Sequence, residues 1–547
     1  MPSTNSLTAC DPQSNATVSA SAGSGKTWLL ITRIVRLLIS GAEPGNIIAL
    51  TFTRKAAAEM QIRLSQRLFE MATADEAQLE AQLELIGCTS DPQTKYVAAG
   101  LYEKLTHSLY PIRIQTFHSF CQDILSRFPL EADIPPGFEL LEDTSLLARQ
   151  AWHALFDAAR DAARDAARGV AGDESSEQNG LATELDTIMQ VCNGPDNTRT
   201  ALNSFLSHRS DWWAFTSHSK QPVEYACQQL TRSLELDSGD IDEDIDKIKA
   251  EQIKQFFDEL TIVKLQNFAG LLLEINLKSS KEHAGSIDLA LRQVDIDQDA
   301  AFDLITSAFI KKDGDKMVQG RQLNPTLEKK LGTENATLFY ELHHEIADRI
   351  LSIKEHIKRL LTLKMNRAWY IAGNRYVEIF QQLKREMRLL DFTDLEWKCY
   401  QLLQYADNAH WVQYKIDQRI DHLLIDEFQD TNPTQWHLLS PILEEIAANP
   451  EQRPRSVFLV GDEKQSIYSF RRANPALQAQ ASDWLAQHLS ATAAPLDSSR
   501  RSSAAIIQSV NAIFEQDEIK SIMTGFTEHG TYLATLPGKV LLTKLFE

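Results

Sequence analysis

The stretch SASAGSGKTWLLITRIVRLL, from Ser19 to Leu38, decides the fold class of this chain. A Gly-Ser-Gly turn comes first, Lys26 and Thr27 follow, and apolar residues then recur at helical spacing. Gly23 and Gly25 allow a tight turn that aims backbone N–H groups at a phosphate, and the helix adds its positive N-terminal end. The stretch therefore predicts a strand, a phosphate-binding loop and a helix in succession.

The candidate phosphate loop departs from the strict GxxxxGK[ST] pattern at its first position, where Ala20 stands in place of Gly. The loop consists of Ala20, Ser21, Ala22, Gly23, Ser24, Gly25, Lys26 and Thr27. In such a loop the lysine reaches the β- and γ-phosphates and the threonine hydroxyl ligates Mg²⁺. We therefore expect ATP and Mg²⁺ as cofactors, with Lys26 on the phosphates and Thr27 on the metal.

Composition sets limits on what surrounds this loop. A length of 547 residues exceeds one ordinary core, so at least two domains are expected. The net charge of −20 means that any nucleic-acid groove must be locally basic on an acidic body. The six scattered cysteines form no CxxC pair, which favours buried free thiols. The chain starts with no secretion signal and contains no apolar run of about 20 residues, so we expect a cytoplasmic protein without a membrane segment.

Short apolar runs bounded by turn residues predict buried parallel strands of an α/β domain. The runs are Ala16–Ser21, Ile47–Thr53, Ile112–Phe117, His422–Asp426 and Val457–Gly461. Helical patterns over Lys26–Ser40 and Arg54–Met71 separate the early runs. Residues 122–389 read as one helix after another, and the α/β pattern then returns. The strands on both sides of this helical insert are therefore predicted to form one parallel sheet.

The repeat DAARDAARDAAR, from Asp157 to Arg168, lies within the insert and allows two interpretations. On a helix the arginines form one stripe, with an aspartate three residues before each of them. A solvated helix held by ion pairs is the ordinary interpretation. A basic rail for a phosphate backbone is the functional one.

The second part of the predicted nucleotide site is HLLIDEFQDT, from His422 to Thr431, an apolar strand that ends in two acids. In phosphate-loop enzymes the first acid holds Mg²⁺, so Asp426 takes that role. The next acid orients and polarises the attacking water, which makes Glu427 the candidate base. Two acids at a strand end could alone form a solvated turn, but the phosphate loop in the same chain disfavours that interpretation.

A third stretch, VFLVGDEKQSIYSFRRAN from Val457 to Asn474, begins with another apolar strand. The neutral amide of Gln465 suits a sensor that hydrogen-bonds a γ-phosphate and loses this partner when the phosphate leaves. Two aromatic and two cationic residues follow, a set that suits stacking on bases and contact with the phosphates of a single strand. They are Tyr468, Phe470, Arg471 and Arg472. Taken alone, the two aromatic residues are more typical of a core than of a binding site.

Together these motifs resemble those of superfamily 1A DNA helicases of the UvrD/Rep type, and most closely the AddA and RecB branch. The shared motifs are ASAGSGKT, TFTRKAAAEM, TFHSFC, DFTDL, LLIDEFQDT and GDEKQSIYSFR. The resemblance implies a RecA-like ATPase domain (1A) at 1–121 and 390–487, a helical insert (1B) at 122–389, and the start of a second RecA-like domain (2A) at 488–547. It also implies ATP hydrolysis coupled to 3′-to-5′ movement on single-stranded DNA, in DNA end processing and recombinational repair. A second recombination or nuclease subunit is an implied partner.

The resemblance assigns further residues by position. Those that would line the DNA track are Phe52, Thr53, Thr116, His118, Tyr468 and Phe470. Gln465 and Arg471 would link this track to the γ-phosphate. In LDSSRRSSAAIIQSVNAIF, Arg501 falls on the arginine finger of the family, and Arg500 replaces the tyrosine that stacks on adenine. Gln13 is the nearest candidate for the glutamine that reads adenine.

The chain also departs from the family pattern at its end. It stops at Glu547, after a predicted strand at Gly538–Leu545, and the later family motifs are absent. We expect a fragment or a gene remnant, because translocation needs two motor domains that close around ATP. The alternative function is a non-motor nucleotide- and DNA-binding module of a larger complex. A phosphate-loop kinase or transporter ATPase would not explain QSIYSFR or TFTRKAAAEM.

Overall fold

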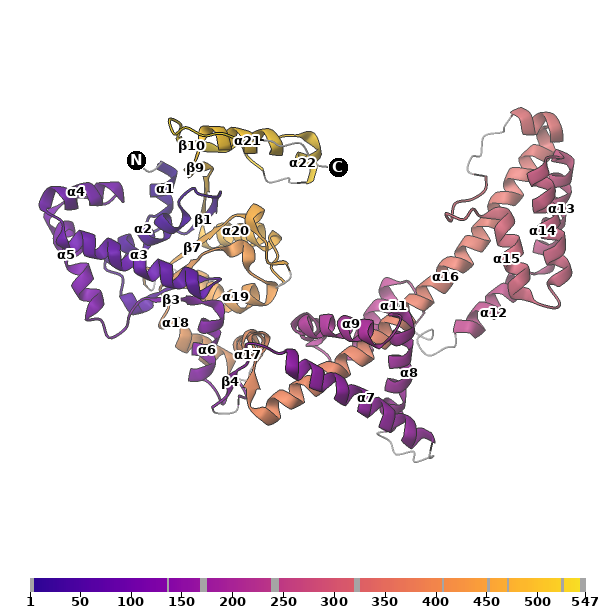
Figure 1. The fold of residues 1–547 in the computed structure, drawn as a ribbon, viewed down its shortest axis with the longest axis horizontal. Coiled ribbons are helices and arrows are strands. Elements are labelled where there is room, and N and C mark those ends of the chain that lie inside the picture. Colours follow the sequence, from indigo (N-terminus) through magenta and orange to yellow (C-terminus); the bar gives the residue numbers. More distant parts are fainter. Residues whose placement is uncertain are drawn as a thin grey trace. The chain divides into compact units, whose positions relative to one another are not determined.

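A computed structural model describes residues 4–134, 137–167, 175–237, 245–318, 325–405, 408–449, 453–469, 472–522 and 526–541. The chain divides into two compact units, labelled by their elements in Figure 1. The first, here called the sheet unit, consists of Met1–Thr144 and Lys384–Glu547. The second, here called the helical unit, is Ser145–Leu383. Each unit is described by itself.

The sheet unit is built on six strands in the order β3-β2-β6-β7-β1-β8, and every neighbouring pair is parallel. The strands are β1 (Ala16–Ala20), β2 (Ile47–Thr51), β3 (Arg113–Thr116), β6 (His422–Ile425), β7 (Ser456–Gly461) and β8 (Thr492–Leu496). The insert separates β3 from β6 in sequence, yet β2 pairs with both of them. The α/β fold class, with a parallel sheet interrupted by a helical insert, is therefore confirmed.

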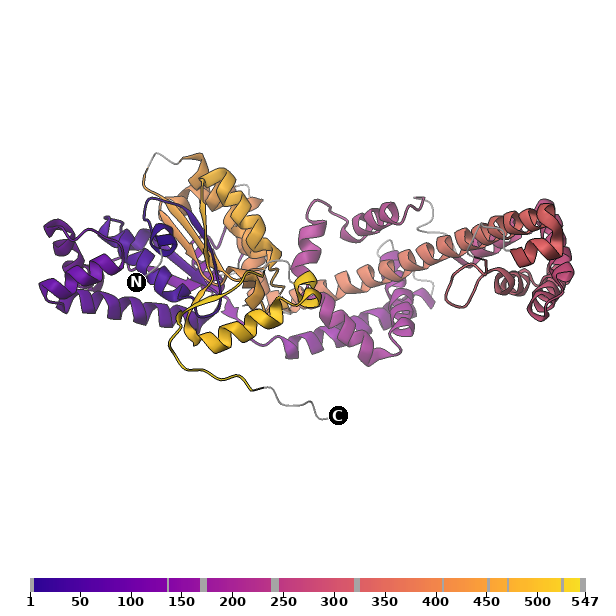
Figure 2. The ribbon, with the colours of Figure 1, turned by 90° about the horizontal axis from the view of Figure 1, so that it is seen from above.

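Apolar side chains cover both faces of this sheet, as near-continuous apolar strands require. In β2, Ile48 and Leu50 belong to one buried core, and the alternating Ile47 and Ala49 belong to the other. The first core is covered by α6 (Phe117–Arg127), α17 (Phe392–Gln404), α18 (Ala409–Asp417), α19 (Pro433–Ala448) and α20 (Ala476–Leu489). The second is covered by α1 (Thr4–Ala9), α2 (Lys26–Ile39), α3 (Arg54–Thr73), α4 (Glu76–Leu85) and α5 (Pro92–Thr106). Figure 2 shows indigo and orange helices on opposite sides of the sheet.

A buried arginine fastens the amino-terminal segment to α2. The Arg33 side chain is fully buried and donates hydrogen bonds to the carbonyls of Ala9, Asp11 and Ser14. Its guanidinium lies 5.3 Å from the ring centroid of Phe458 on β7. Burial lowers the pKa of Arg33 to about 10. The segment before β1 is therefore part of the support of the loop helix.

The unit boundaries differ from the expected domain boundaries. Helix α6 was expected to enter the insert at residue 122, but its apolar face packs in the core of the sheet unit, and the helical unit begins at Ser145. Strand β8 was expected in a second domain from residue 488, but it pairs with β1 in the main sheet. Sequence pattern could not reveal either assignment, because both depend on contacts between distant elements.

The segment after β8 forms a small addition within the sheet unit. It contains β9 (Ser498–Ser503), α21 (Ala504–Phe514), α22 (Asp517–Ile522) and β10 (Gly530–Leu533), and β9 pairs with β10 in parallel. The expected strand at Gly538–Leu545 is wrong over its described part, because residues 538–541 have no regular structure. The remainder of that stretch lies outside the described residues.

A buried cluster of ion pairs lies in the sheet unit at the point where the chain returns from the insert. The two-residue strands β4 (Glu139–Leu140) and β5 (Leu389–Leu390) pair there in parallel. The Lys384 ammonium lies 3.0 Å from Asp391 Oδ2 and also contacts Asp394, and all three side chains are buried. Asp391 and Asp394 form the capping box of α17, so the cluster fixes the start of this helix.

The helical unit consists of ten helices in its described part. They are α7 (Ser145–Ala167), α8 (Ser175–Val191), α9 (Pro195–Ser207), α10 (Arg209–Thr216), α11 (Pro222–Ser233), α12 (Ile245–Phe256), α13 (Glu259–Ile275), α14 (Lys278–Gln293), α15 (Gln298–Phe309) and α16 (Pro325–Met387). Helix α16 has a non-helical residue at Gly332 and runs to the end of the unit. No helix in the described ranges combines the length and apolar character needed to cross a membrane.

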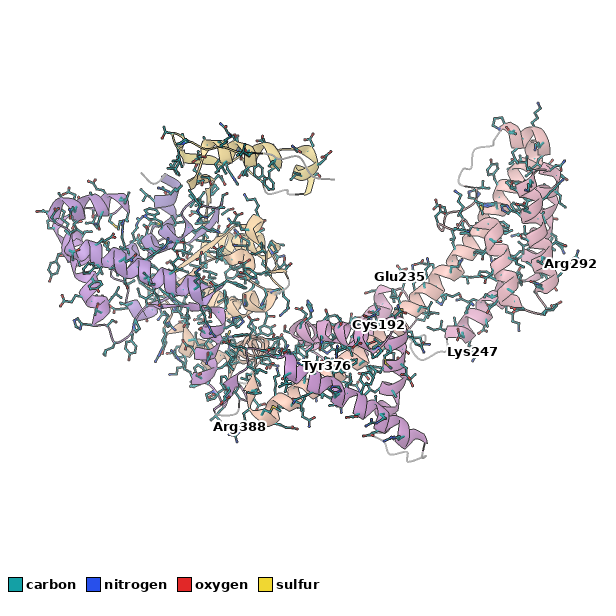
Figure 3. All side chains as sticks on the ribbon, in the orientation of Figure 1. Cys192, Glu235, Lys247, Arg292, Tyr376 and Arg388 are labelled. Carbon is teal, nitrogen blue, oxygen red and sulfur yellow. The ribbon has the colours of Figure 1, made fainter. Side chains whose placement is uncertain are left out.

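Aromatic packing holds the helical unit together. In one core cluster Phe268 is 1% exposed, with Phe309 and Phe339 at ring-centroid distances of 4.8 and 4.9 Å. Elsewhere the hydroxyl oxygen of Tyr376, a residue labelled in Figure 3, lies within hydrogen-bond distance of the Ala148 carbonyl at 2.9 Å and of Asn203 Oδ1 at 2.7 Å. These contacts lie in the interior of the helical unit. They agree with the helical pattern of apolar residues in the sequence of the insert.

The aspartate–arginine repeat lies in α7. Arg160 pairs with Asp157 at 2.7 Å and Arg164 pairs with Asp161 at 3.8 Å, and all four side chains are exposed. The interpretation as a solvated helix held by ion pairs is therefore confirmed for these two pairs. Arg168 lies outside the described residues.

Candidate functional site

The phosphate loop follows β1 at the carboxyl edge of the sheet. Gly23 and Gly25 have φ angles of +76° and +103°, in the left-handed region that favours glycine. A Cβ on Gly23 would lie 2.9 Å from Arg501 Cβ, so this position has no room for a side chain. Gly25 is the N-cap of α2 and offers no side chain to its first N–H groups. Loop and helix thus present backbone donors suited to an anion.

The other residues of the predicted loop surround this turn. Ala20 ends β1 as a buried residue, Ala22 is exposed, and Thr27 is half-buried on the first turn of α2. The buried hydroxyl of Ser24 has no hydrogen-bond partner in the part of the chain that the structure describes. A polar group left without a partner inside a site is costly, which fits a position that a polar ligand completes.

Lys26 lies beside the acids expected to work with it. Its Nζ donates a hydrogen bond to Glu427 Oε2 at 2.9 Å, across 401 positions of sequence. The Gln429 side-chain amide donates to the same carboxylate oxygen at 2.7 Å. β6 lies two strands away from β1, with β7 between them, and the carboxyl ends of all three meet at one edge. The sheet therefore brings the phosphate loop and the acid pair together.

Asp426 and Asp430 at this edge have pKa values above those of ordinary carboxyls. Burial, followed by the charge of Glu427, raises the pKa of Asp426 to about 7 against the opposing effect of Lys26. The same causes raise the pKa of Asp430 to about 6. Asp430 was missed in the sequence analysis, although it is the third acid of DEFQDT. A divalent cation would favour the ionised form of such carboxyls, which fits a magnesium site here.

A buried amide connects the acid pair with the expected sensor. Gln429 is 2% exposed, and its Oε1 accepts a hydrogen bond from the Asp462 N–H at 2.9 Å. Gln465 Nε2 donates to Asp462 Oδ2 at 2.6 Å. Hydrogen bonds therefore run from Glu427 through Gln429 and Asp462 to Gln465. Sequence reasoning missed Gln429, because its role depends on a neighbouring strand.

Two of the expected DNA-track residues lie together and two act as helix caps. The ring centroids of Phe52 and Tyr468 are 4.6 Å apart, and both residues are half-buried. Thr53 accepts a hydrogen bond from Ala56 N at the start of α3. Thr116 does the same for Ser119 N at the start of α6, where it is buried. Phe470 and Arg471 lie outside the described residues.

His118 belongs to a polar cluster that the sequence analysis did not foresee. Its Nε2 lies 3.0 Å from Oε1 of Glu396, a buried acid that also accepts hydrogen bonds from Asn432 and Gln435. Burial works to raise the pKa of Glu396, but the interactions with His118 and the two amides outweigh it and lower that pKa. The cluster therefore couples the start of α6 to the helix that follows the acid motif.

The segment after β8 lies against the phosphate loop. The Arg500 N–H donates to the Gly23 carbonyl at 2.7 Å, and Arg501 Cβ is the neighbour that limits Gly23. The guanidinium of Arg500 lies 4.6 Å from the ring centroid of Tyr532 and 5.8 Å from that of Trp28. The two arginines assigned by resemblance are thus next to the loop.

His529 contacts the phosphate loop, and Gln13 lies in the segment before β1. His529 Nε2 lies 3.0 Å from Ser21 Oγ, a contact that no sequence signal indicated. Burial, followed by the charge of Lys464, lowers the pKa of His529. Gln13 is exposed, and its backbone N–H donates to Asp11 Oδ1.

Comparison with known proteins agrees with this arrangement. The family model described as "UvrD/REP helicase N-terminal domain" matches residues 2–484. Among curated proteins, the chain is 26% identical to an ATP-dependent helicase/nuclease subunit of Latilactobacillus sakei, over 84% of this chain and 48% of that protein. It is 26% identical to the proteins of the same name from Lactobacillus johnsonii and Listeria monocytogenes, over 91% and 92% of this chain. Those matches cover 38% of each relative.

The chain thus spans less than half the length of these curated relatives. The family match, by contrast, covers most of this chain, from the phosphate loop through the acid motif to α20. The chain belongs to the family of UvrD/REP helicase N-terminal domains.

Proposed function

We propose that this chain is the N-terminal motor portion of an ATP-dependent DNA helicase that moves 3′-to-5′ on single-stranded DNA. The single observation that supports this most is the 2.9 Å contact between Lys26 and Glu427, which joins the phosphate loop to the acid pair. The family and the names of the relatives support the ATP-dependent helicase part of the proposal. We also propose that the protein acts in DNA end processing and recombinational repair, together with a second nuclease or recombination subunit.

Mg²⁺-ATP supplies the phosphoanhydride bond whose hydrolysis drives movement. Lys26 and the loop N–H groups bind the phosphates, and Thr27 and Asp426 hold the metal. Glu427 orients the attacking water and accepts its proton, which requires the carboxylate to leave its contact with Lys26. The backbone of Arg501 lies next to Gly23 of the phosphate loop. From there its guanidinium offsets the charge that develops on the phosphates.

Coupling to DNA is assigned to the hydrogen-bond chain between Glu427 and Gln465. A change at the acid pair shifts Gln429 and Asp462, and through them the segment that carries Tyr468. The Phe52 and Tyr468 rings, whose centroids lie 4.6 Å apart at an interplanar angle of 36°, then supply an aromatic platform for bases. In this proposal His118 and the two capping threonines keep the start of α3 and α6 in place beside the strand.

The deciding experiment measures ATP hydrolysis by the full natural protein with and without oligo-dT. We expect stimulation by the oligonucleotide, and its loss in Tyr468→Ala with basal hydrolysis retained. Direction is tested with oligonucleotides that carry streptavidin on a biotin at one end. A 3′-to-5′ motor displaces streptavidin from the 5′ end, and displacement from the 3′ end would overturn the polarity. Nucleotide and strand binding without movement would favour the non-motor module instead.

A further inference from the structure

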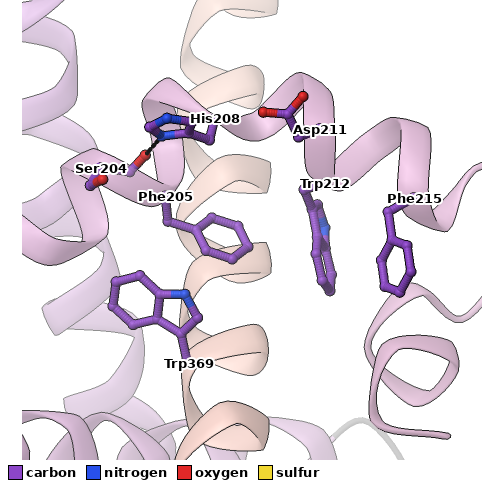
Figure 4. Close-up of a pocket in the computed structure, with 7 residues that line it drawn as sticks. All are labelled: Ser204, Phe205, His208, Asp211, Trp212, Phe215 and Trp369. Atoms are coloured by element: carbon purple, nitrogen blue, oxygen red, sulfur yellow. Dashed lines mark hydrogen bonds between the residues drawn. The ribbon is translucent and has the colours of Figure 1, made fainter. Parts of the chain in front are cut away.

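Two places in the molecule gather polar or aromatic side chains that the proposed ATP hydrolysis does not use. One is a pocket of the helical unit between α9, α10 and α16, lined by aromatic rings (Figure 4). The Asp211 carboxylate points away from these rings, so the space between them is apolar. The other is a polar cluster of the sheet unit, where α6, α17 and α19 meet around the carboxylate of Glu396. The contacts of this cluster assign it a function.

Glu396 carries a buried charge. The residue is 4% exposed, and His118 Nε2 lies 3.0 Å from its Oε1. Asn432 Nδ2 donates to Oε2 at 3.0 Å, and Gln435 Nε2 donates to Oε1 at 2.6 Å. Burial works to raise the pKa of Glu396, but the contacts with the imidazole and the two amides lower it. A buried charge costs free energy that a neutral side chain would avoid, so packing alone does not account for this residue.

The capping box of α19 is complete without Glu396. Asn432 Oδ1 accepts a hydrogen bond from the Gln435 N–H at 2.9 Å, and Gln435 Oε1 accepts one from the Asn432 N–H at 3.2 Å. Each amide therefore uses its oxygen for the cap and its nitrogen for Glu396. The carboxylate is not needed to begin the helix. It instead fixes the first turn of α19 against the imidazole on α6.

A short buried turn joins the acid motif to the start of α19. It contains the 3-10 turn Phe428–Asp430, and Asn432 is the N-cap of the helix. The Asp430 N–H donates to the Glu427 carbonyl at 3.0 Å, and the Thr431 N–H donates to the Phe428 carbonyl at 2.9 Å. Every residue of the turn is buried, and closely packed segments transmit displacements. A shift of the start of α19 is therefore passed to Glu427.

His118 is the member of the cluster that a ligand can reach. Its side chain is 29% exposed, whereas that of Glu396 is 6% exposed. Phe392 packs edge to face against the imidazole, with ring centroids 4.6 Å apart, and so holds its plane. A phosphate only accepts hydrogen bonds, so it would bind the other ring nitrogen through an N–H. The ring would then carry a proton on both nitrogens, with Glu396 as its counter-charge.

We propose that Glu396 is a positioning residue that couples contact between a DNA phosphate and His118 to the acid motif. This inference rests on the proposed function, because it requires single-stranded DNA beside α6 and ATP at the phosphate loop. It adds a second connection to the one through Gln429, and the new connection begins at a different part of the DNA track. The helix that carries Glu396 is anchored separately by Lys384, so the displacement passes to α19.

The test measures how DNA changes nucleotide binding by the full natural protein. The Kd of a fluorescent, non-hydrolysable ATP analogue is determined with and without saturating oligo-dT, and the ratio of the two values is the coupling factor. Linked sites typically show factors of about 5–150. Glu396→Gln keeps the shape but offers one acceptor oxygen in place of two. It should lower the coupling factor about threefold or more, while the affinity for each ligand alone changes much less.

Leu402→Val is the matched control, because it disturbs a buried apolar residue of the same helix. It should lower stability and leave the coupling factor unchanged. If it lowers the factor as much as Glu396→Gln does, the role of Glu396 is packing and the proposal is overturned. A factor of one in the unaltered protein would overturn the proposed function, and this inference with it. A larger factor that Glu396→Gln leaves unchanged would overturn this inference alone.

His118→Gln provides a second variant that leaves the buried carboxylate in place. Its amide keeps a donor for Glu396 but lacks the second ring nitrogen that would bind a phosphate. We expect it to lower the coupling factor as well, and to add nothing when combined with Glu396→Gln. Additive losses would show that the two residues act separately and would overturn the proposal. Circular dichroism checks that each variant is folded.

Discussion

The phosphate-loop edge of the sheet unit and the interior of the helical unit are built in opposite ways. At the sheet edge, Lys26 contacts an acid 401 positions away, and each residue type is dictated by a backbone position or by a ligand. In the helical unit, contacts such as Phe268 with Phe309 connect neighbouring helices, and several apolar residues could serve there. The residues of the sheet edge can therefore be assigned chemical roles from the sequence. The apolar residues of the helical unit indicate only that helices pack there.

The largest expected effect on activity comes from replacing Lys26. We expect Lys26→Ala to lower ATP hydrolysis by about 10³-fold or more, because it removes the cation that would bind the phosphates. Phosphate release and binding of a fluorescent ATP analogue measure the two losses. Lys104→Ala is the control, since Lys104 is an exposed lysine of α5 and should leave both rates unchanged. Normal hydrolysis by Lys26→Ala would remove the loop from the mechanism.

A narrower change separates binding from turnover. Glu427→Gln should reduce hydrolysis by about 10²–10⁴-fold, because the amide cannot accept the proton of water. ATP binding should be largely retained, since Asp426 remains available for the metal. Glu444→Gln on the exposed side of α19 is the matched control. If Glu427→Gln also abolishes ATP binding, the roles of the two acids must be reassigned.

Stability measurements compare the two regions on one scale. Lys384→Met leaves Asp391 and Asp394 buried without their cation, which should cost the sheet unit about 3–5 kcal/mol. Phe268→Ala should cost the helical unit about 3–5 kcal/mol through the cavity it leaves. Urea unfolding followed by circular dichroism should show each variant weakening a different transition. A single transition shifted equally by both variants would mean that the regions unfold as one.

The smallest expected effect concerns pH. Because the pKa of Asp426 is raised to about 7, the folded protein holds a proton that the unfolded chain releases above about pH 4. The free energy of unfolding without Mg²⁺ should therefore fall between about pH 4 and 7, by about 1–4 kcal/mol from this group. Asp426→Asn should remove that part of the slope, which the difference between the two unfolding curves isolates. Parallel curves would show that Asp426 titrates normally.

Strands were predictable wherever they are apolar and buried on both faces. The strands at Ile47 and Val457 were found within one residue of their predicted starts. The exception is β8, Thr492–Leu496, which lies at the edge of the sheet and contains Pro495. Proline is tolerated at such an edge, so the sequence lacks the usual strand pattern there. Its place became visible only through its pairing with β1.

The residues of the candidate site also fall into a predictable and an unpredictable group. Lys26, Asp426 and Glu427 were predictable because strand ends and a glycine turn fix their surroundings. Gln429, Glu396 and His529 were not, because their neighbours include residues of distant segments and ordinary residue types fill these positions.

The buried guanidinium of Arg33 has a practical consequence for handling this protein. Removing the first fifteen residues would remove the carbonyls of Ala9, Asp11 and Ser14 that accept its hydrogen bonds. The buried positive charge of Arg33 on α2 would then lack these acceptors. An unpaired buried ion costs several kcal/mol, enough to impair expression of a shortened version. Shortened versions of the protein should therefore keep the segment that contains Ala9, Asp11 and Ser14.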